Sequence, residues 1–503
     1  MPNKPKALLK KPKKSAKQQI PTTPDEFQEA ADFEEETAGK WRAGDKAKSS
    51  RAYMRAIEIY DDGLKKFPNN SDLAYNKARL EFELSQQPAL VSKLNVSLLQ
   101  LLEQTLSSHR YALRLNEDNP DVLFNTAQVM ITIAETVSDA GPGASTASPD
   151  IINLLQEALE LLNACYSRQE MLLEEQRSKW NEPEEDGGVA LGEAAQGISG
   201  PGASSTEDDN HNSVEEQSAT VQAATTPMDL LDTARASVDA LTLLVSLTDP
   251  SSLPTLASMA HTLTDVKIPY CFSQLDPSER PDMEKEVAVS RAEFIAALAL
   301  AECKSGDITV ADFLSRLSVF DALDLAADVA AMCTYADLLV ESVETMLIFN
   351  VRSSVKENLA QLCWTQLTRA QDLYGKVVKL DDEEAKDRKA QIYESRGDVE
   401  MLRFRLATAA AGELSPAVKS SAPTLIKNAQ TYYRGSSNLF RAGGDEDAAK
   451  KADVRGLVAA AVESQAAGTA SEQGRAVLSG KEAQVVIMDM MSEGLLGEQW
   501  GQA

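Results

Sequence analysis

A seven-residue motif occurs twice in the chain, and this internal repeat constrains the fold more than any other feature. Asp72–Ala78 (DLAYNKA) recurs as Asp121–Ala127 (DVLFNTA), a spacing of 49 residues. Each copy follows an amphipathic segment and an asparagine-rich turn, and each ends on a small residue where two helices can cross closely. A helix-turn-helix unit cannot bury its apolar face alone, so stacked copies must share one continuous core. The repeat therefore predicts a helical solenoid.

Helix signals surround the first copy. Thr23, Pro24 and Glu26 have the spacing of a capping box with proline at the first helical position, which predicts a helix from Pro24 to about Lys40. A second helix, ending at Pro68, is indicated by apolar residues at three- and four-residue steps: Tyr53, Ala56, Ile57, Tyr60 and Leu64. Alternating strand-like runs are nearly absent, which predicts an all-α fold.

Later segments follow the same pattern. Ala390 and Tyr393, a turn at Gly397-Asp398, and then Leu402 indicate a further helix-turn-helix unit. Two more second helices are indicated by small and large apolar pairs, namely Ala158 with Leu162 and Ala370 with Tyr374. The most apolar stretch, 326–349, carries four acids, so we expect a buried helix pair there and no membrane span.

These residues resemble the tetratricopeptide-repeat family. Ala56, Tyr60 and Pro68 match the second-helix part of that motif, and Ala390 with Tyr393 match the first-helix part. The resemblance extends over roughly 24–135 and 355–410. It departs from the family in the 49-residue spacing and in Ala74, which stands where the family has tryptophan. The resemblance implies a divergent solenoid of helical hairpins that binds other proteins.

Composition divides the chain into five segments. Residues 1–23 contain seven lysines and no acid, and residues 181–226 contain ten acids and no lysine or arginine. Both are expected to be disordered because they are rich in charge, Pro, Gly or Ser. The expected organisation is a basic tail (1–23), TPR-like repeats (24–180), an acidic insert (181–226), continued repeats (227–480) and a terminal capping helix or partner motif (481–503).

The charge of the chain limits its partners. The formal net charge is −27, and the +7 of the tail with the −10 of the insert leave −24 on the helical body. Such a body is unsuited to nucleic acid and to anionic membranes, whereas a basic protein client suits it. This exclusion of nucleic acid and anionic membranes applies to the helical body and not to the basic tail.

Residues that would indicate chemistry are sparse. The five cysteines have no CxxC spacing and are expected to be reduced and buried, and the three histidines are scattered. Phosphate-binding glycine loops of the GxxxxGK[ST] and GxGxxG types are absent. We therefore expect no metal, no cofactor and no catalytic site, and we interpret the protein as a non-enzymatic binder.

Two sets of residues are candidates for binding. Side chains on the expected first helices could line a concave face and bond to a peptide backbone: Asn76, Arg79, Asn125 and Gln128. An ordinary polar helix face is the alternative.

Lysines near the N-terminus have the density of a nuclear-import signal: Lys10, Lys11, Lys13 and Lys14. A solvated or RNA-contacting tail, or one that folds back on the acidic surface, is the alternative.

The sequence supports two functional hypotheses. One is an acidic chaperone or adaptor that shields a basic client, of the ribosomal-protein or histone type, in the cytoplasm or nucleus during assembly. The other is a neutral scaffold of a cytoplasmic complex in which charge serves only solubility. The client and the oligomeric state are not encoded in any short motif of the chain.

Overall fold

A computed structural model describes residues 21–94, 96–139, 149–181, 224–326, 328–349, 359–409, 414–468, 480–497 and 500. Every element in these ranges is helical. The α-helices are α1 (Pro24–Trp41), α2 (Lys46–Lys66), α3 (Ser71–Ser85), α4 (Pro88–Val91), α5 (Leu98–Leu115), α6 (Pro120–Asp139), α7 (Pro149–Asn181), α8 (Pro227–Leu247), α9 (Leu253–Thr262), α10 (Ile268–Gln274), α11 (Arg280–Ser305), α12 (Val310–Leu317), α13 (Val329–Phe349), α14 (Leu359–Val377), α15 (Glu383–Asp387), α16 (Lys389–Ala409), α17 (Pro416–Ser420), α18 (Ala422–Gly443), α19 (Glu446–Ala466) and α21 (Lys481–Ser492). Short turns η1 (Pro250–Ser252), η2 (Leu263–Lys267) and η3 (Ser318–Ala322) complete them.

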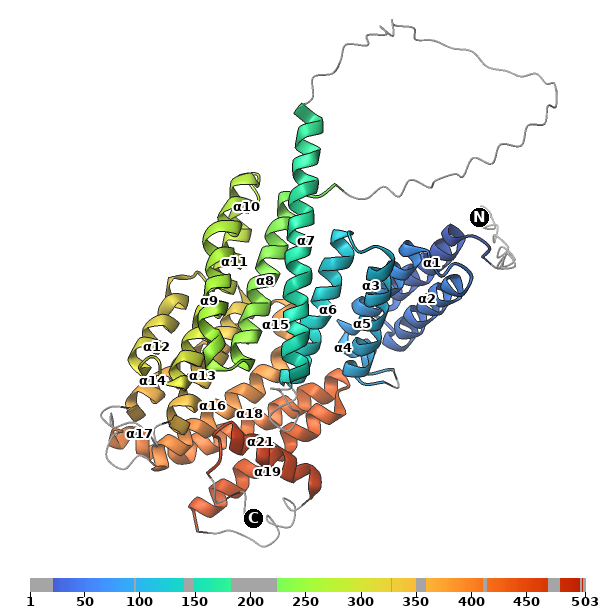
Figure 1. Ribbon diagram of the computed structural model, residues 1–503. Helices are drawn as coiled ribbons and strands as arrows, with labels where there is room; N and C mark the ends of the chain where they lie inside the picture. Colours follow the sequence, from blue (N-terminus) through green and yellow to red (C-terminus); the bar gives the residue numbers. More distant parts are fainter. Residues whose placement is uncertain are drawn as a thin grey trace, which may run out of the picture.

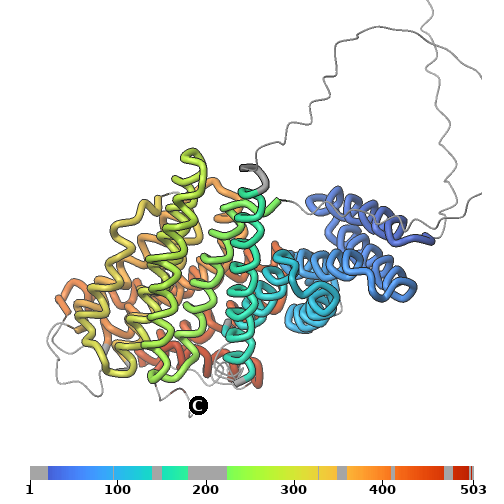
Figure 2. The backbone as a smooth tube through the Cα atoms, turned by 45° about the horizontal axis from the view of Figure 1, so that its top comes forward, coloured from blue at the N-terminus to red at the C-terminus, as the bar shows by residue number. Residues whose placement is uncertain are grey.

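Successive helices pack as antiparallel hairpins that stack along the chain (Figure 1). Helix α1 packs on α2, α3 on α5, α6 on α7, α13 on α14 and α16 on α18, while α7–α8, α8–α11 and α14–α16 contacts join the hairpins. The array curves, so that α16–α21 pass beneath the central helices toward the N-terminal half (Figures 1 and 2). Lys93, just after α4, accordingly lies 3.7 Å from the position that a Cβ on Gly444 would take. The predicted all-α solenoid is confirmed.

The repeated motif begins two equivalent helices. In the first copy, the Asn70 side chain caps α3 by accepting from the Leu73 amide at 2.8 Å, and in the second the Asn119 side chain accepts from the Asp121 amide at 2.9 Å. Ala78 and Ala127 are both fully buried. The asparagine-rich turns are therefore helix caps, and the small residues allow close helix crossings.

The array buries three large apolar clusters that succeed one another along the chain. In the N-terminal cluster, Tyr53, Ala56, Ile57 and Tyr60 of α2 are buried, which confirms the predicted apolar face. None of the five cysteines forms a disulfide, and all are buried except the half-buried Cys303. Among the helices that the structure describes, none combines the length and the hydropathy that a membrane-spanning segment requires.

Three local predictions were wrong. The Gly397-Asp398 turn does not exist, because α16 runs unbroken through it. Residues 329–349 form one helix, α13, and not a helix pair. The Thr23 hydroxyl does accept from the Glu26 amide at 3.3 Å, but the Glu26 carboxylate accepts from the Thr22 amide at 2.6 Å and so does not close the expected box.

Candidate binding surface

Arg79, a predicted partner-binding residue, is engaged within the fold. Its guanidinium lies 2.8 Å from Glu35 of α1 and 3.4 Å from Glu83 of its own helix α3. Glu35 also accepts from the Tyr60 hydroxyl at 3.2 Å. Arg79 therefore joins α3 to α1, and binding of a partner would have to compete with this half-buried ion pair.

The other three predicted residues lie half-buried on two different helices. Asn125 on α6 donates its amide to the Tyr75 hydroxyl at 2.7 Å, which links α6 to α3 across the repeat. Asn76 on α3 and Gln128 on α6 are half-buried on the same two helices. Their role in binding stays a prediction. The lysines of the expected import signal lie outside the described residues.

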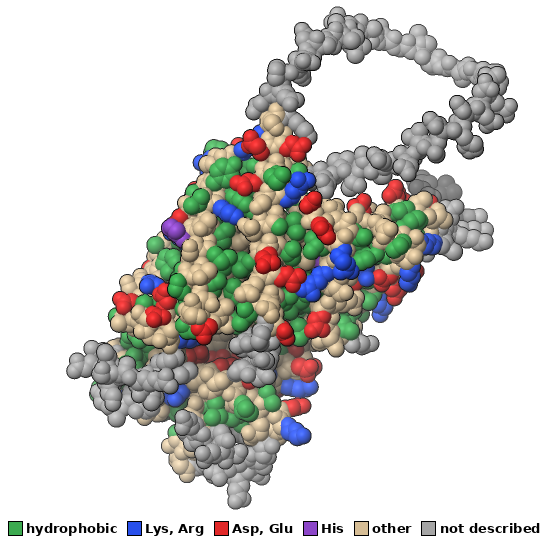
Figure 3. All heavy atoms as spheres, viewed as in Figure 1, with side chains coloured by type: hydrophobic (Ala, Val, Ile, Leu, Met, Phe, Trp, Pro, Cys, Tyr) green, Lys and Arg blue, Asp and Glu red, His purple; other side chains and the backbone are tan. Residues whose placement is uncertain are grey.

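A different set of side chains forms three groups of carboxylates, and the members of each group repel one another. We call the three groups together the acidic seam. The first group is Asp121 of α6, Asp229 and Asp232 of α8, and Glu286 of α11; the second is Asp239 of α8, Glu293 of α11 and Asp328 before α13; the third is Glu341 and Glu344 of α13, Glu394 and Asp398 of α16, and Glu493 after α21. Figure 3 shows acidic side chains in the recess between the central helices and the C-terminal helices.

The central part of the acidic seam has few cations. Arg235 lies 4.0 Å from Asp232 and 3.8 Å from Glu286, both long distances for an ion pair. Lys285 lies 3.7 Å from Asp328, and Lys304 lies 3.2 Å from Glu341. Partly exposed pairs of this kind contribute little to stability. Carboxyl groups therefore outnumber the cations beside them in this part of the acidic seam.

The C-terminal part is organised by one buried cation. Arg455 of α19 is 3% exposed and lies 3.1 Å from Glu394, 2.6 Å from Asp398 and 2.8 Å from Glu493. The buried Tyr433 hydroxyl donates to Asp398 at 2.6 Å. One guanidinium thus contacts two carboxylates of α16 and one that follows α21, and it joins α19 to both of these helices.

Burial and mutual repulsion make these carboxyl groups hard to ionise. Burial, together with the charge of Asp239, raises the pKa of Glu293 to about 7. Burial, together with Glu493 and Glu341, raises the pKa of Glu344 to about 8. At pH 7 such a group is partly or mostly protonated, and a lysine or arginine brought to it favours the ionised form. Binding of a basic ligand is therefore coupled to ionisation of these groups.

Sequence reasoning missed the acidic seam, although a signal was present. Acids recur on single helix faces at three-, four- or seven-residue steps, as Asp229 and Asp232, Glu286 and Glu293, or Glu394 and Asp398 do. What the sequence does not contain is the alignment of these faces with one another. No cluster of three or more His, Cys, Asp or Glu side chains in the described ranges could hold a metal ion.

Comparison with known proteins gives one partial relative. No protein-family model matches the chain. The chain is 35% identical over 146 residues to UPF0656 protein C926.02 of Schizosaccharomyces pombe, a match that covers 29% of this chain and 31% of that protein. The match thus spans less than a third of the relative, and what the rest of either chain does is not assigned by it.

Two solved structures are similar in being helical arrays. One is a circular tandem repeat protein with novel repeat topology, with a TM-score of 0.28 and 13% identity over 94% of this chain and 96% of that one. The other is Nro1, described as a hypoxic regulator of sterol synthesis and a nuclear import adaptor, with a TM-score of 0.26 and 12% identity over 83% of this chain and 89% of that one. Superposition at this level is too loose to support a functional argument.

Proposed function

We propose that this protein is a non-enzymatic chaperone or adaptor that binds an extended, basic segment of a client protein along the acidic seam. We further propose that the array is a divergent member of the tetratricopeptide type and that the client is of the ribosomal-protein or histone type. The observation that carries the proposal is the acidic seam, whose half-buried carboxylates lack sufficient counter-charge in the free protein. Opposite charge would speed association and make it sensitive to salt.

The test is recovery of partners from cell extract by a seam variant. The combination D232N/E286Q/E293Q/E344Q replaces four seam carboxyl groups, and D381N/E383Q/E446Q/D447N replaces four carboxyl groups whose side chains are 95%, 89%, 63% and 95% exposed. We expect wild type and control to retain basic partners at low salt and release them at high salt, and the seam variant to lose them at both. Recovery of only neutral or acidic partners, unaffected by salt, would contradict the proposal.

The alternative is a neutral scaffold in which charge serves solubility alone. It predicts that the seam variant keeps every partner of the wild-type protein, so the same experiment decides between the two functions. The described charges favour the chaperone, because solubility needs no carboxylates buried against one another as Glu293 and Asp239 are.

We also propose that the protein reaches both nucleus and cytoplasm and that the lysine-rich tail contributes an import signal. A fluorescently tagged chain lacking residues 1–17 should shift from nucleus to cytoplasm, whereas the full chain should enter the nucleus. Identical distributions of the two would remove the import proposal and leave the acidic seam unaffected.

A further inference from the structure

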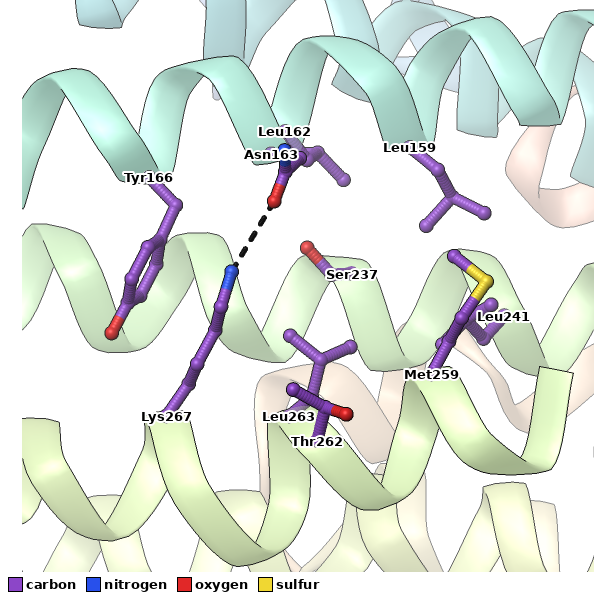
Figure 4. A pocket seen from close by; sticks show the side chains of 10 residues that line it. All are labelled: Leu159, Leu162, Asn163, Tyr166, Ser237, Leu241, Met259, Thr262, Leu263 and Lys267. Carbon is purple, nitrogen blue, oxygen red and sulfur yellow. Dashed lines mark hydrogen bonds between the residues drawn. The ribbon is translucent and has the colours of Figure 1, made fainter. Parts of the chain in front are cut away.

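A pocket opens between α7, α8 and α9. Its volume is about 200 Å³, and its lining is mostly apolar: Leu159, Leu162, Asn163 and Tyr166 of α7, Ser237 and Leu241 of α8, and Met259, Thr262, Leu263 and Lys267 of α9 and η2 (Figure 4). Successive helical residues are rotated by roughly 100°, so Asp239 stands roughly 200° from both Ser237 and Leu241. Among the seam residues of α8, Asp239 therefore lies on the side of the helix away from the pocket.

A π-helical turn shapes one wall of the pocket. The helix from Leu253 to Gln274 is continuous, but Pro269 has no amide hydrogen to donate and its ring would clash with the preceding turn. The chain widens there into η2, where the Ile268 amide donates to the Leu263 carbonyl. This turn holds Leu263 and Lys267 against the pocket. Such turns are rare and frequently mark functional sites.

Lys267 is an unusual cation in this acidic chain. Its ammonium crosses the pocket mouth, lies 4.2 Å from the centre of the Tyr166 ring and donates to the side-chain amide oxygen of Asn163 at 3.3 Å (Figure 4). No carboxylate oxygen in the described ranges lies within 4.0 Å of Nζ, although Glu170 attracts it from farther away. Burial lowers the pKa of Lys267. The half-buried charge thus has only neutral direct partners.

Exposed apolar side chains lie on the same continuous helix as the lining residues Met259 and Lys267, and we call them the rim. Met259, Val266 and Tyr270 are 42%, 62% and 39% exposed. Figure 3 shows apolar side chains at the surface over α7, α8 and α9. A cavity of ~150 Å³ lined by Leu, Ile and Phe holds a benzene ring, whereas drug-sized ligands occupy ~300–1,000 Å³. This pocket therefore suits a single side chain, with the rim available to the residues beside it.

We propose that this pocket is a second binding site, for an acidic peptide segment of a partner protein that inserts one Leu- or Phe-sized side chain and places a neighbouring carboxylate on Lys267. The apolar pocket and rim select the anchor, and the ammonium without a carboxylate partner selects the charge. The pocket lining contains no residue of the acidic seam, so a basic client and an acidic partner can be held together. This inference does not depend on the function proposed for the acidic seam.

The test selects phage-displayed random peptides on the full chain and measures binding of an enriched peptide by fluorescence polarisation. We expect enrichment of an apolar residue adjacent to Asp or Glu. Loss of a hydrogen bond to a charged group should weaken binding ~10- to 100-fold in K267Q, while K267R keeps the charge and most of the affinity. M259E places a like charge at the rim and should weaken binding, whereas M171E, at an exposed position outside the lining, should not.

The substituted side chains are at least partly exposed, so far-UV circular dichroism should show unchanged helix content in all four variants. The seam variant should bind the selected peptide as wild type does, which separates failure of this site from failure of the acidic seam. Absence of enrichment, enrichment of basic peptides, or equal affinity for wild type and K267Q would overturn the proposal.

Discussion

Single residues decide how the acidic seam is held. Arg455 compensates Glu394, Asp398 and Glu493 at once, yet one positive charge faces three carboxyl groups. Burial therefore prevails at Asp398, whose pKa is raised to about 7 in spite of the guanidinium. A carboxyl group with a raised pKa in the folded state stabilises the fold at low pH, and this contribution is lost as pH rises from its unfolded pKa through its folded pKa.

Replacement of Arg455 by Met should be strongly destabilising at pH 7 and above. It leaves buried carboxylates without a partner, which costs ~3–5 kcal/mol of unfolding free energy. The deficit should shrink at about pH 5, because the remaining carboxyl groups protonate more readily without the guanidinium. Urea unfolding at the two pH values measures this. An equal deficit at both would show that Arg455 acts by packing, not by charge.

At the scale of elements, a close contact between two helices explains why a glycine expected in a turn lies inside a helix. A Cβ on Gly397 of α16 would lie 2.6 Å from the Tyr433 ring of α18, and one on Gly435 of α18 would lie 2.6 Å from the Tyr393 ring. The two helices thus approach at reciprocal glycines. Glycine followed by aspartate indicates a turn locally, and only the position of α18 shows that Gly397 serves packing instead.

G397A should therefore destabilise the protein, although alanine favours helices. Tyr433 is fully buried and bonded to Asp398, so it cannot easily move, and overpacking of this kind costs ~1–3 kcal/mol. The matched control is G375A on α14, where nothing lies within 4 Å of the added Cβ and a gain of ~0.5–1 kcal/mol is expected. Thermal unfolding of both variants provides the comparison, and a stabilised G397A would refute the close-contact account.

At the scale of the molecule, the sequence predicts the class of fold but not its surfaces. The repeat at Asp72 and Asp121 is local, and each copy can be recognised by its cap and its small residue. The acidic seam depends on how α8, α11, α13 and α16 align across long stretches of chain, and the pocket depends on the widened turn before Pro269. Arg79 was predicted from its polarity alone, which does not reveal its partner Glu35 on α1.

The most direct test of binding along the acidic seam uses the raised pKa values of its carboxyl groups. A cation that binds beside such a group favours the ionised form, so binding must release protons. Isothermal titration of an extended Lys/Arg-rich peptide, in buffers of different ionisation enthalpy at pH 7, counts those protons. Glu293 and Glu344 have pKa values of about 7 and about 8, so we expect release on the order of one proton per complex. Because binding releases protons, the affinity should increase as the pH rises from 6 to 8. Release should fall in E293Q/E344Q. Binding without proton release, or release unchanged in that variant, would contradict the account.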